Sequence, residues 1–372
     1  MSISQVFNGF DNSSVANFIS WGSLISSKLA AAGWVQQNDT GQVVWNATVL
    51  TLTQVTVGAN AVYSYSSFTG PAPRVGMSIN VTGFTNGGNN VSNAVIAAVS
   101  GGASGTVTVA LTTQVNETHA GSATTTAVAA VPSTIGAYEI WAPGDALQTG
   151  STQFFLKVQY GNQSTTTNQP SVGFSIGSAT NGAGTLTGNT IGIYQSNSQS
   201  PVSGSTSLFE FDFSYDTDRL GIMVRNNSSL AFLFVVERTH NTDGTDSTDG
   251  VVMFFIGVNQ FTKMRVLVFS PAVLAAVERS QTGGSDWHIS MPVIPPQNSD
   301  SFNSSIPVAP MFPDYGKYGN PMTTYAATGN NDVAEGMLLT TTLYGATRTY
   351  MASKINTYYS SNNTLISLFR WD

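Results

Sequence analysis

The sequence has no cysteine, and only 9% of its 372 residues are charged, against roughly 25% in an ordinary soluble domain. The absence of cysteine excludes disulfides, thiolate metal sites and cysteine nucleophiles. Lys and Arg total 13 against 20 Asp and Glu, and they form no basic cluster along the chain. A net charge of −7 argues against nucleic-acid binding through a basic surface, and we predict no nucleic-acid partner.

Long apolar runs are also missing. The longest, such as 251–258, are one strand long and far short of the ~20 residues that cross a bilayer, so we expect no membrane insertion. The first residues, MSISQVFNGFDNSS, have no basic region followed by an apolar one, which predicts the absence of a secretory signal.

Hydrophobic residues nevertheless make up 41% of the chain and aromatic residues 10%, which argues against disorder and predicts a packed core. The polar surface must then consist mainly of Ser, Thr, Asn, Gln and Gly. Such a surface suits a protein packed into a larger assembly, because burying uncharged groups avoids the desolvation cost of burying charge.

One segment has helical periodicity. Apolar residues recur every three or four positions over 15–29, after Asn12, Ser13 or Ser14 as N-cap and before Gly33 as C-cap. This spacing predicts a helix over 13–32.

The central part of the chain predicts β-strands. Residues 208–216 alternate Phe or Tyr with acidic residues or Ser, which is typical of a half-buried strand. Two apolar runs around 226–229 predict a hairpin, and the unbroken runs 251–258 and 264–270 predict strands buried on both faces.

Charge nearly vanishes between 49 and 131, where only Arg74 and Glu117 carry a formal charge and Trp is absent. Short β-like runs separated by Gly, Pro and Asn predict about six strands in a small sandwich or barrel. The flanks resemble each other in style, so we interpret 49–131 as a domain inserted into a loop of a parent fold. The predicted strands are 49–57, 62–68, 77–84, 93–99, 105–111 and 123–131.

The predicted fold is mainly β, with a sandwich-like parent domain, one N-terminal helix and an inserted small barrel or immunoglobulin-like domain. The parent comprises 1–48 and 132–290. A Pro-rich extended arm is predicted over 291–322, followed by a C-terminal β segment, 323–372, that docks on the parent or on a neighbour.

No pattern supports catalysis. Residues 173–177 match GxSxG around Ser175, but the match lies inside an alternating run without a following helix, which favours a strand over a nucleophile elbow. The glycine-rich segment 181–188 lacks phosphate-binding spacing and is predicted to be a hairpin or bulge loop.

Acidic pairs on one strand face could serve a glycosidase, but such neighbours are more often solvated. These pairs are Glu210 with Asp212 and Asp216 with Asp218. We therefore predict no catalytic residue and no cofactor, and interpret the chain as a non-enzyme.

Metal binding has only weak candidates. Three acids of one loop could surround Ca²⁺, but they lack the alternate spacing and terminal Glu of a calcium loop, so an exposed hairpin tip is favoured; they are Asp243, Asp246 and Asp249. Glu117 and His119 share a strand face, yet two ligands do not make a site. The other histidines, His240 and His288, have no partner at ligand spacing.

Surface contacts have candidates of two kinds. Aromatic side chains on β loops can bind glycans, and the candidates are Tyr63, Tyr65, Tyr315 and Tyr318. The chain ends on a large apolar pair, Phe369 and Trp371, which indicates a docked C-terminus and gives two candidate assembly contacts.

Several segments together resemble virion structural proteins of tailed bacteriophages, of the tail, baseplate and neck region. The resemblance is carried by Phe18–Trp45, Tyr138–Trp141, Asp145–Gly150, Phe155–Gly161 and 175–188. The charge-poor segment looks like a small β module that recurs in such proteins, through 75–78, 83–86, 89–91 and 116–121.

The resemblance implies a virion component that is made and assembled in the bacterial cytoplasm, in contact with its own copies and with other virion proteins. Two alternatives stay open, a protein that binds host-surface glycan and a cement protein of the capsid surface. The family supplies no catalytic residues.

Overall fold

The computed structural model shows a protein built mainly of β-strands, as predicted. It describes residues 2–163, 165, 169–195, 209–226, 229–241, 245–257, 263–268, 277–280, 289–290, 309–310, 312–313, 325–328, 336–343, 346–353 and 366–372. No helix in these ranges is long and apolar enough to cross a membrane.

The predicted helix is present as α1 (Val15–Ala31). Its N-cap is Ser14, whose side chain accepts a hydrogen bond from the Asn17 backbone N–H at 3.1 Å. The C-cap is Ala32, one residue before the predicted Gly33. Gly33 follows with φ of +85°, in the left-handed region that only glycine adopts readily.

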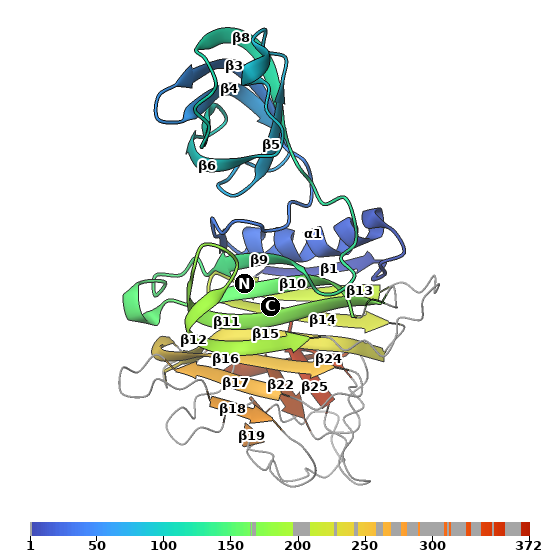
Figure 1. Ribbon diagram of the computed structural model, residues 1–372. Coiled ribbons are helices and arrows are strands. Elements are labelled where there is room, and N and C mark those ends of the chain that lie inside the picture. Colours follow the sequence, from blue (N-terminus) through green and yellow to red (C-terminus); the bar gives the residue numbers. More distant parts are fainter. Residues whose placement is uncertain are drawn as a thin grey trace, which may run out of the picture.

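Two antiparallel sheets form a sandwich (Figure 1). The seven-stranded sheet has the order β1 (Ser2–Asn8), β13 (Phe209–Asp216), β14 (Arg219–Asn226), β15 (Ser229–His240), β16 (Asp246–Gly257), β17 (Lys263–Val268) and β18 (Val277–Ser280). The second sheet of the sandwich, here called the small sheet, has five strands. Their order is β12 (Leu186–Gln195), β11 (Pro170–Thr180), β10 (Phe155–Asn162), β9 (Ala137–Ala142) and β2 (Val35–Gln36).

The sandwich core lies between these sheets and α1. The aromatic face of β13 points into it, and Phe174 of β11 stacks on Phe234 of β15 with ring centroids 3.7 Å apart. The predicted hairpin of β14 and β15 is confirmed. The strand predicted over 251–258 falls in β16, which ends at Gly257, and its described side chains, Val251, Val252, Met253 and Phe255, are buried.

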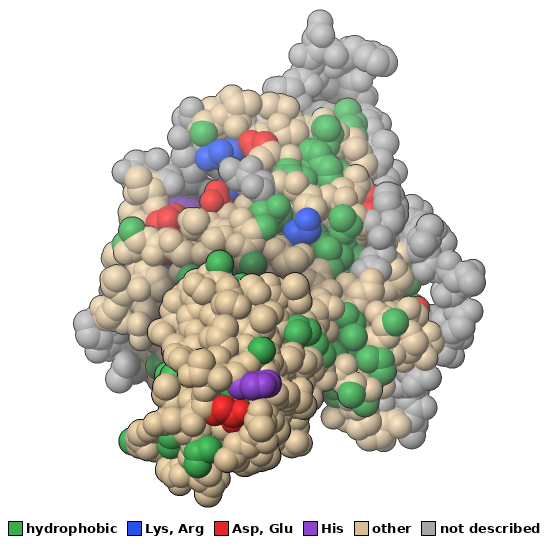
Figure 2. All heavy atoms as spheres, turned by 90° about the horizontal axis from the view of Figure 1, so that it is seen from above, with side chains coloured by type: hydrophobic (Ala, Val, Ile, Leu, Met, Phe, Trp, Pro, Cys, Tyr) green, Lys and Arg blue, Asp and Glu red, His purple; other side chains and the backbone are tan. Residues whose placement is uncertain are grey.

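Six strands close into a barrel with its own apolar core, which stands apart from the sandwich in Figure 1 and in the foreground of Figure 2. Their order is β3 (Val49–Val57), β4 (Ala61–Thr69), β7 (Gly105–Val109), β6 (Ala94–Gly101), β5 (Ser78–Thr82) and β8 (Glu117–Thr125). The strand predicted over 123–131 is wrong in its bounds, since β8 ends at Thr125. The 3-10 turn η1 (Gly87–Asn89) lies between β5 and β6.

The chain enters the barrel after β2 and leaves it before β9. These two strands pair with each other, Val35 opposite Ala142. The barrel therefore interrupts the sequence between two neighbouring strands of the small sheet. The division into a parent and an inserted domain at 48 and 131 stays a prediction.

A third layer, the C-terminal sheet, lies on the other side of the seven-stranded sheet (Figure 1). Its order is β20 (Ala309–Pro310), β22 (Tyr325–Thr328), β25 (Ile366–Arg370), β24 (Ala346–Ser353) and β23 (Leu338–Leu343). A separate pair joins β19 (Ile289–Ser290) to β21 (Phe312–Pro313). Most of the predicted arm, 291–322, lies outside the described residues.

The half-buried character predicted for 208–216 is wrong. Leu208 lies outside the described residues, but the polar face of β13 is buried as well, with Asp212 and Ser214 at 0% exposure. This face belongs to the side of the seven-stranded sheet that faces away from the sandwich core, where the chain adds its third layer.

Candidate functional site

The connection between the barrel and the sandwich, here called the junction, comprises residues 39–48 with Arg74 and Glu139. Within it Val43 and Trp45 belong to the sandwich core, whereas Val44 belongs to the barrel core. Val43 N–H donates to the Tyr138 carbonyl at 2.9 Å, and Val128 N–H donates to the Val44 carbonyl at 2.8 Å. Successive side chains of extended backbone point to opposite sides. Val43 and Trp45 therefore point into the sandwich core while Val44, between them, points into the barrel core.

Trp45 packs directly against α1. Its ring makes edge contacts with Phe18, at 5.3 Å between centroids, and with Tyr160, at 4.9 Å. A Cβ added to Gly22 would lie 2.2 Å from this ring. The glycine in the apolar stripe of α1 is therefore the place where the tryptophan approaches the helix backbone.

Glu139 of β9 is a carboxylate at 1% exposure in the centre of the junction. Tyr160 Oη donates to Oε2 at 2.8 Å, and Ser26 Oγ and Gln36 Nε2 donate to Oε1 at 2.9 and 3.0 Å. Burial raises the pKa of Glu139, and the hydrogen bonds and the charge of Arg74 offset this only in part. One buried acid thus joins the helix and three strands of the sandwich.

Arg74 reaches the same place from the loop between β4 and β5. Its Nη2 donates to the Val43 carbonyl at 3.0 Å. Burial lowers the pKa of Arg74, and the charge of Glu139 acts in the opposite direction. Arg74 is the only Lys or Arg of the segment 49–131, and it holds a barrel loop against the sandwich.

The other end of the junction is closed by the hairpin between β11 and β12. Thr180 Oγ1 and the Gly184 N–H both donate to Asp39 Oδ2, the latter at 2.9 Å, and Thr40 N–H donates to the Gly182 carbonyl at 2.8 Å. Lys157 Nζ bonds the Gly184 carbonyl at 2.6 Å. The predicted hairpin loop over 181–188 is confirmed.

Ser175 lies within β11, paired with Lys157 of β10. The prediction of an ordinary strand at this GxSxG match is therefore confirmed.

The junction gives a pH prediction. The pKa of Glu139 is raised in the folded protein, so its contribution to stability is present below pH ~4.5 and is lost as the pH rises through the folded pKa. We expect Glu139→Gln to gain about 1 kcal/mol in unfolding free energy relative to wild type between pH 5 and pH 8, measured by urea unfolding.

Glu117→Gln is the matched control. The pKa of Glu117 is lowered, since hydrogen bonds from Asn89, Thr85 and Asn86 outweigh burial. Its difference from wild type should therefore stay constant between pH 5 and pH 8. A constant difference for Glu139→Gln as well would refute the raised pKa.

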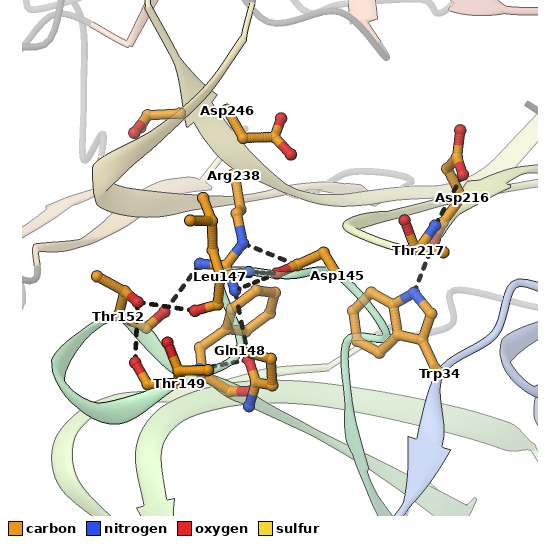
Figure 3. Close-up of polar contacts among 12 residues, drawn as sticks. Trp34, Asp145, Leu147, Gln148, Thr149, Thr152, Asp216, Thr217, Arg238 and Asp246 are labelled. Carbon is orange, nitrogen blue, oxygen red and sulfur yellow. Dashed lines mark hydrogen bonds and ion pairs between the residues drawn. The ribbon is translucent and has the colours of Figure 1, made fainter.

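A buried ion pair links β15 of the seven-stranded sheet to the segment between β9 and β10 of the small sheet (Figure 3). Arg238 of β15, at 0% exposure, contacts both oxygens of Asp145, with Nε–Oδ2 at 2.8 Å and Nη2–Oδ1 at 3.0 Å. Its remaining donors reach the Thr152 carbonyl in the 3-10 turn η2 (Gly150–Thr152) at 2.8 Å and Gln148 Oε1 at 3.3 Å, and it lies over the Phe154 ring. The segment 145–152 is thus a cradle for one guanidinium group.

The tyrosines predicted as glycan contacts are not surface residues where the structure describes them. Tyr63 and Tyr65 are 0% and 3% exposed in the barrel core, with their hydroxyls bonded to the Asn89 and Gly102 carbonyls. That prediction is wrong for both. Tyr315 and Tyr318 lie outside the described residues.

Of the two candidate assembly contacts, Phe369 is 1% exposed within the C-terminal sheet, so the prediction that it is an assembly contact is wrong. Trp371 is partly buried, and its backbone N–H donates to the Thr349 carbonyl at 2.7 Å.

The weak calcium candidates do not come together where they are described. Asp246 faces His240 and Asp249 is exposed, while Asp243 lies outside the described residues. In the part of the chain that the structure describes, no three His, Asp or Glu side chains gather as a metal would require.

The prediction that the acids of β13 and the following turn are simply solvated is wrong for Asp212 and Asp218, which are buried. Arg225 bonds both Asp212, at 2.8 Å, and Glu210, at 2.8 Å, and Asp218 is only 8% exposed. Asp216 is the most exposed of these acids, with 40% of its side chain exposed, and it pairs with Arg219 at 3.1 Å.

His240, which has no partner at ligand spacing in the sequence, is 4% exposed. Its Nδ1 lies 3.4 Å from Asp246 Oδ1 and its Nε2 lies 4.0 Å from Glu237 Oε2. Burial alone would lower the pKa of His240. The two carboxylates outweigh this effect and raise the pKa from 6.5 to about 9. His119 is exposed on the barrel, and His288 lies outside the described residues.

No protein-family model matches the chain, and neither a curated protein nor a solved structure does. The resemblance to tailed-phage virion proteins therefore stays a prediction.

Proposed function

We propose that the protein is a structural component of a tailed-phage particle, in the tail, baseplate or neck region. In this proposal several copies dock through their sandwiches, and the barrel of each copy projects outward. The resemblance of the junction segments to such virion proteins supports the class of protein, and the barrel supports the division of roles.

The observation that carries the proposal is the charge-poor surface of the barrel. Its two formal charges are both used within the chain, Arg74 at the junction and Glu117 on the 85–89 loop, where it accepts from Thr85 N–H at 2.7 Å and Asn89 Nδ2 at 2.7 Å. Figure 2 shows that uncharged polar side chains and backbone dominate the outer face of the barrel.

This surface suits barrels that project beside one another from neighbouring docked sandwiches. Barrels with so few charges repel one another little at short range. The glycan-binding alternative is not proposed, because its described tyrosines are buried.

Removing the barrel tests the division of roles. The two ends of the barrel segment meet, since Thr125 N–H donates to the Thr48 carbonyl at 2.9 Å, so two glycines can replace residues 49–124. We expect this variant to keep a folded sandwich and to enter particles as the full-length chain does.

Two readouts separate folding from assembly. The segment 49–131 has no Trp, so tryptophan fluorescence during urea unfolding follows only the rest of the chain in both proteins. Incorporation is measured by immunoblotting of purified particles. A variant that unfolds cooperatively but no longer enters particles would show that the barrel carries the assembly contacts, contrary to the proposal.

A further inference from the structure

The strand β23 forms one end of the C-terminal sheet. It pairs with β24 along its whole length without a register shift, and among the described residues no strand pairs with its other side. Leu338, Thr340 and Thr342 are exposed, whereas Leu339 between them is buried. The outer edge of β23, here called the free edge, is therefore open to solvent.

The hydrogen bonds at the start of β23 show which backbone groups point to the free edge. The Ala352 N–H donates to the Met337 carbonyl at 2.8 Å. Hydrogen-bonded and non-hydrogen-bonded pairs alternate along an antiparallel ladder. Leu338, Thr340 and Thr342 therefore turn their N–H and carbonyl groups away from β24 and toward the free edge.

The other side of β24 gives the same result. The Trp371 N–H donates to the Thr349 carbonyl at 2.7 Å, so this carbonyl points to the side of β25. Thr349 is the partner of Thr340, and the two consequently form a non-hydrogen-bonded pair. The free edge thus presents a row of backbone donors and acceptors that β24 does not use.

β23 has none of the features that normally keep an edge strand from pairing with another chain. Such strands are shielded by charged residues, proline, bulges or very short length. The sequence of β23 is LLTTTL, which has no charge and no proline and is rich in the β-branched residue threonine, which favours strands.

The other ends of the described sheets are shorter or shielded. β2 and β20 have two residues each, and so do both strands of the pair β19 and β21. β18 carries Glu278 and Arg279, and the pairing of β12 with β11 has two irregularities. β1 lies beside α1, whose Lys28 donates to Ser4.

The free edge also exposes the end of an apolar row. Leu338 lies opposite Met351, and Met351 lies opposite Phe369, so the three side chains share one face of the sheet. Met351 and Phe369 are 4% and 1% exposed, but Leu338 is 52% exposed. A strand added at the free edge would bury this uncovered end of the row.

We propose that the free edge binds the free edge of a second copy of this chain. The two β23 strands run antiparallel, with their Thr340 residues opposite each other and Leu338 opposite Thr342 of the second copy. This register pairs every backbone group that points outward, through about six hydrogen bonds, and joins the two five-stranded C-terminal sheets into one. The pairing does not rest on the proposed function.

The choice of a second copy follows from the self-complementarity of the free edge. A row of unpaired backbone groups accepts an extended strand, and a two-fold axis at Thr340 brings the same row onto itself. Because β23 is uncharged, the two strands do not repel each other. Leu338 is then covered by the methyl group of Thr342 of the second copy.

The size of the contact sets its strength. One strand from each copy buries less than about 1,200 Å², an area typical of weak and transient contacts. We therefore expect the purified full chain to be in a monomer–dimer equilibrium, with a dissociation constant on the order of 10–100 μM. Sedimentation equilibrium measures this constant, and a chain that is still monomeric at about 1 mM overturns the proposal.

Thr340→Pro tests the surface. Its N–H points away from β24, so proline removes a donor of the free edge and no hydrogen bond within the sheet. We expect the dissociation constant to rise by more than about tenfold, while Thr340→Val, which keeps the N–H, leaves it unchanged. Tryptophan fluorescence during urea unfolding shows that each variant is folded.

Leu338→Lys is a second variant, and it decides the question even if Thr340→Pro fails to fold. The side chain of Leu338 is exposed, so lysine is tolerated in the monomer but places one charge of the same sign on each copy at the contact. It should also raise the dissociation constant by more than about tenfold. A dimer that Leu338→Lys leaves intact forms through another surface and contradicts the proposal.

The absence of cysteine allows a test of the register. In the proposed pair the two Thr340 Cα atoms are about 5.5 Å apart, within the range of about 4.4–6.8 Å that a disulfide spans. The two Thr342 Cα atoms are more than about 13 Å apart. Full chains that carry Thr340→Cys, Thr342→Cys or the barrel variant Thr118→Cys, at an exposed position, are oxidised with diamide at about 100 μM protein.

We expect Thr340→Cys to form the covalent dimer more than about tenfold faster than either of the other two variants. Equal rates for Thr340→Cys and Thr118→Cys would report random collisions and overturn the pairing. Faster cross-linking of Thr342→Cys than of Thr340→Cys would contradict the proposed register.

Discussion

Asp145→Ala is expected to lower the free energy of unfolding by about 3–5 kcal/mol. Arg238 would then be left at 0% exposure without the carboxylate that binds two of its nitrogens. Removing the hydrogen-bonded partner of a buried charge has this cost because water does not reach the charge to replace it. Urea unfolding followed by tryptophan fluorescence measures the difference.

Two further variants isolate the ion pair. Removing both charges, by Asp145→Leu with Arg238→Met, should recover most of the loss, because apolar groups of similar volume need no partner. Asp249→Ala, at an exposed position, should change the free energy by less than about 0.5 kcal/mol. A loss of under about 1 kcal/mol for Asp145→Ala would show that solvent reaches Arg238.

Gly22→Ala is expected to destabilise the protein by about 1–3 kcal/mol, although alanine alone would favour the helix by about 1 kcal/mol. The new methyl group would lie 2.2 Å from the Trp45 ring. The ring has no open side to move to, since it is 6% exposed and packs on Phe18 and Tyr160.

A double-mutant cycle checks the cause. In a Trp45→Leu background Gly22→Ala should become neutral or stabilising, because the clash is gone and the helix propensity remains. Gly87→Ala, where a Cβ meets nothing within 4 Å, serves as the control substitution. A stabilising Gly22→Ala in the wild-type chain would mean that Trp45 does not pack against α1 as described.

The sequence predicts the elements that depend on local pattern. The periodicity of α1 and the apolar runs of β14 to β17 are visible within a few residues, and each is found within a few positions of its prediction. The strand β1 was not predicted, because its pairing partner β13 lies about 200 residues away and its own residues show little pattern.

The bounds of the last barrel strand were predicted wrongly because the apolar residues after it belong to the other core. The apolar run 123–131 predicts one strand, but Val128 and Val131 pack against the sandwich core and not against the barrel core. The true strand, β8, has the sequence ETHAGSATT, which contains no large apolar residue. Its place in the barrel is fixed by pairing with β3 and β5, which no local pattern reveals.

The buried polar groups were the hardest to predict. Tyr63 and Tyr65 alternate with serine, so the same pattern fits exposed rings or buried rings with bonded hydroxyls. His240 finds Asp246 only because β15 and β16 pair, across an irregularity after Arg238. Glu139 stands between apolar neighbours, and its donors come from Ser26, Gln36 and Tyr160, far away in the sequence.

The charge-poor barrel is the feature on which the proposed function depends, and its position in a particle tests the account most directly. The measurement is an electron cryo-microscopy map of particles produced by the host cell that carries this sequence. We expect density for several symmetry-related copies in the tail, baseplate or neck, with the sandwich against the particle and the barrel pointing outward. Purified particles that lack the chain, or copies whose barrels are buried and whose sandwiches face outward, would contradict the account.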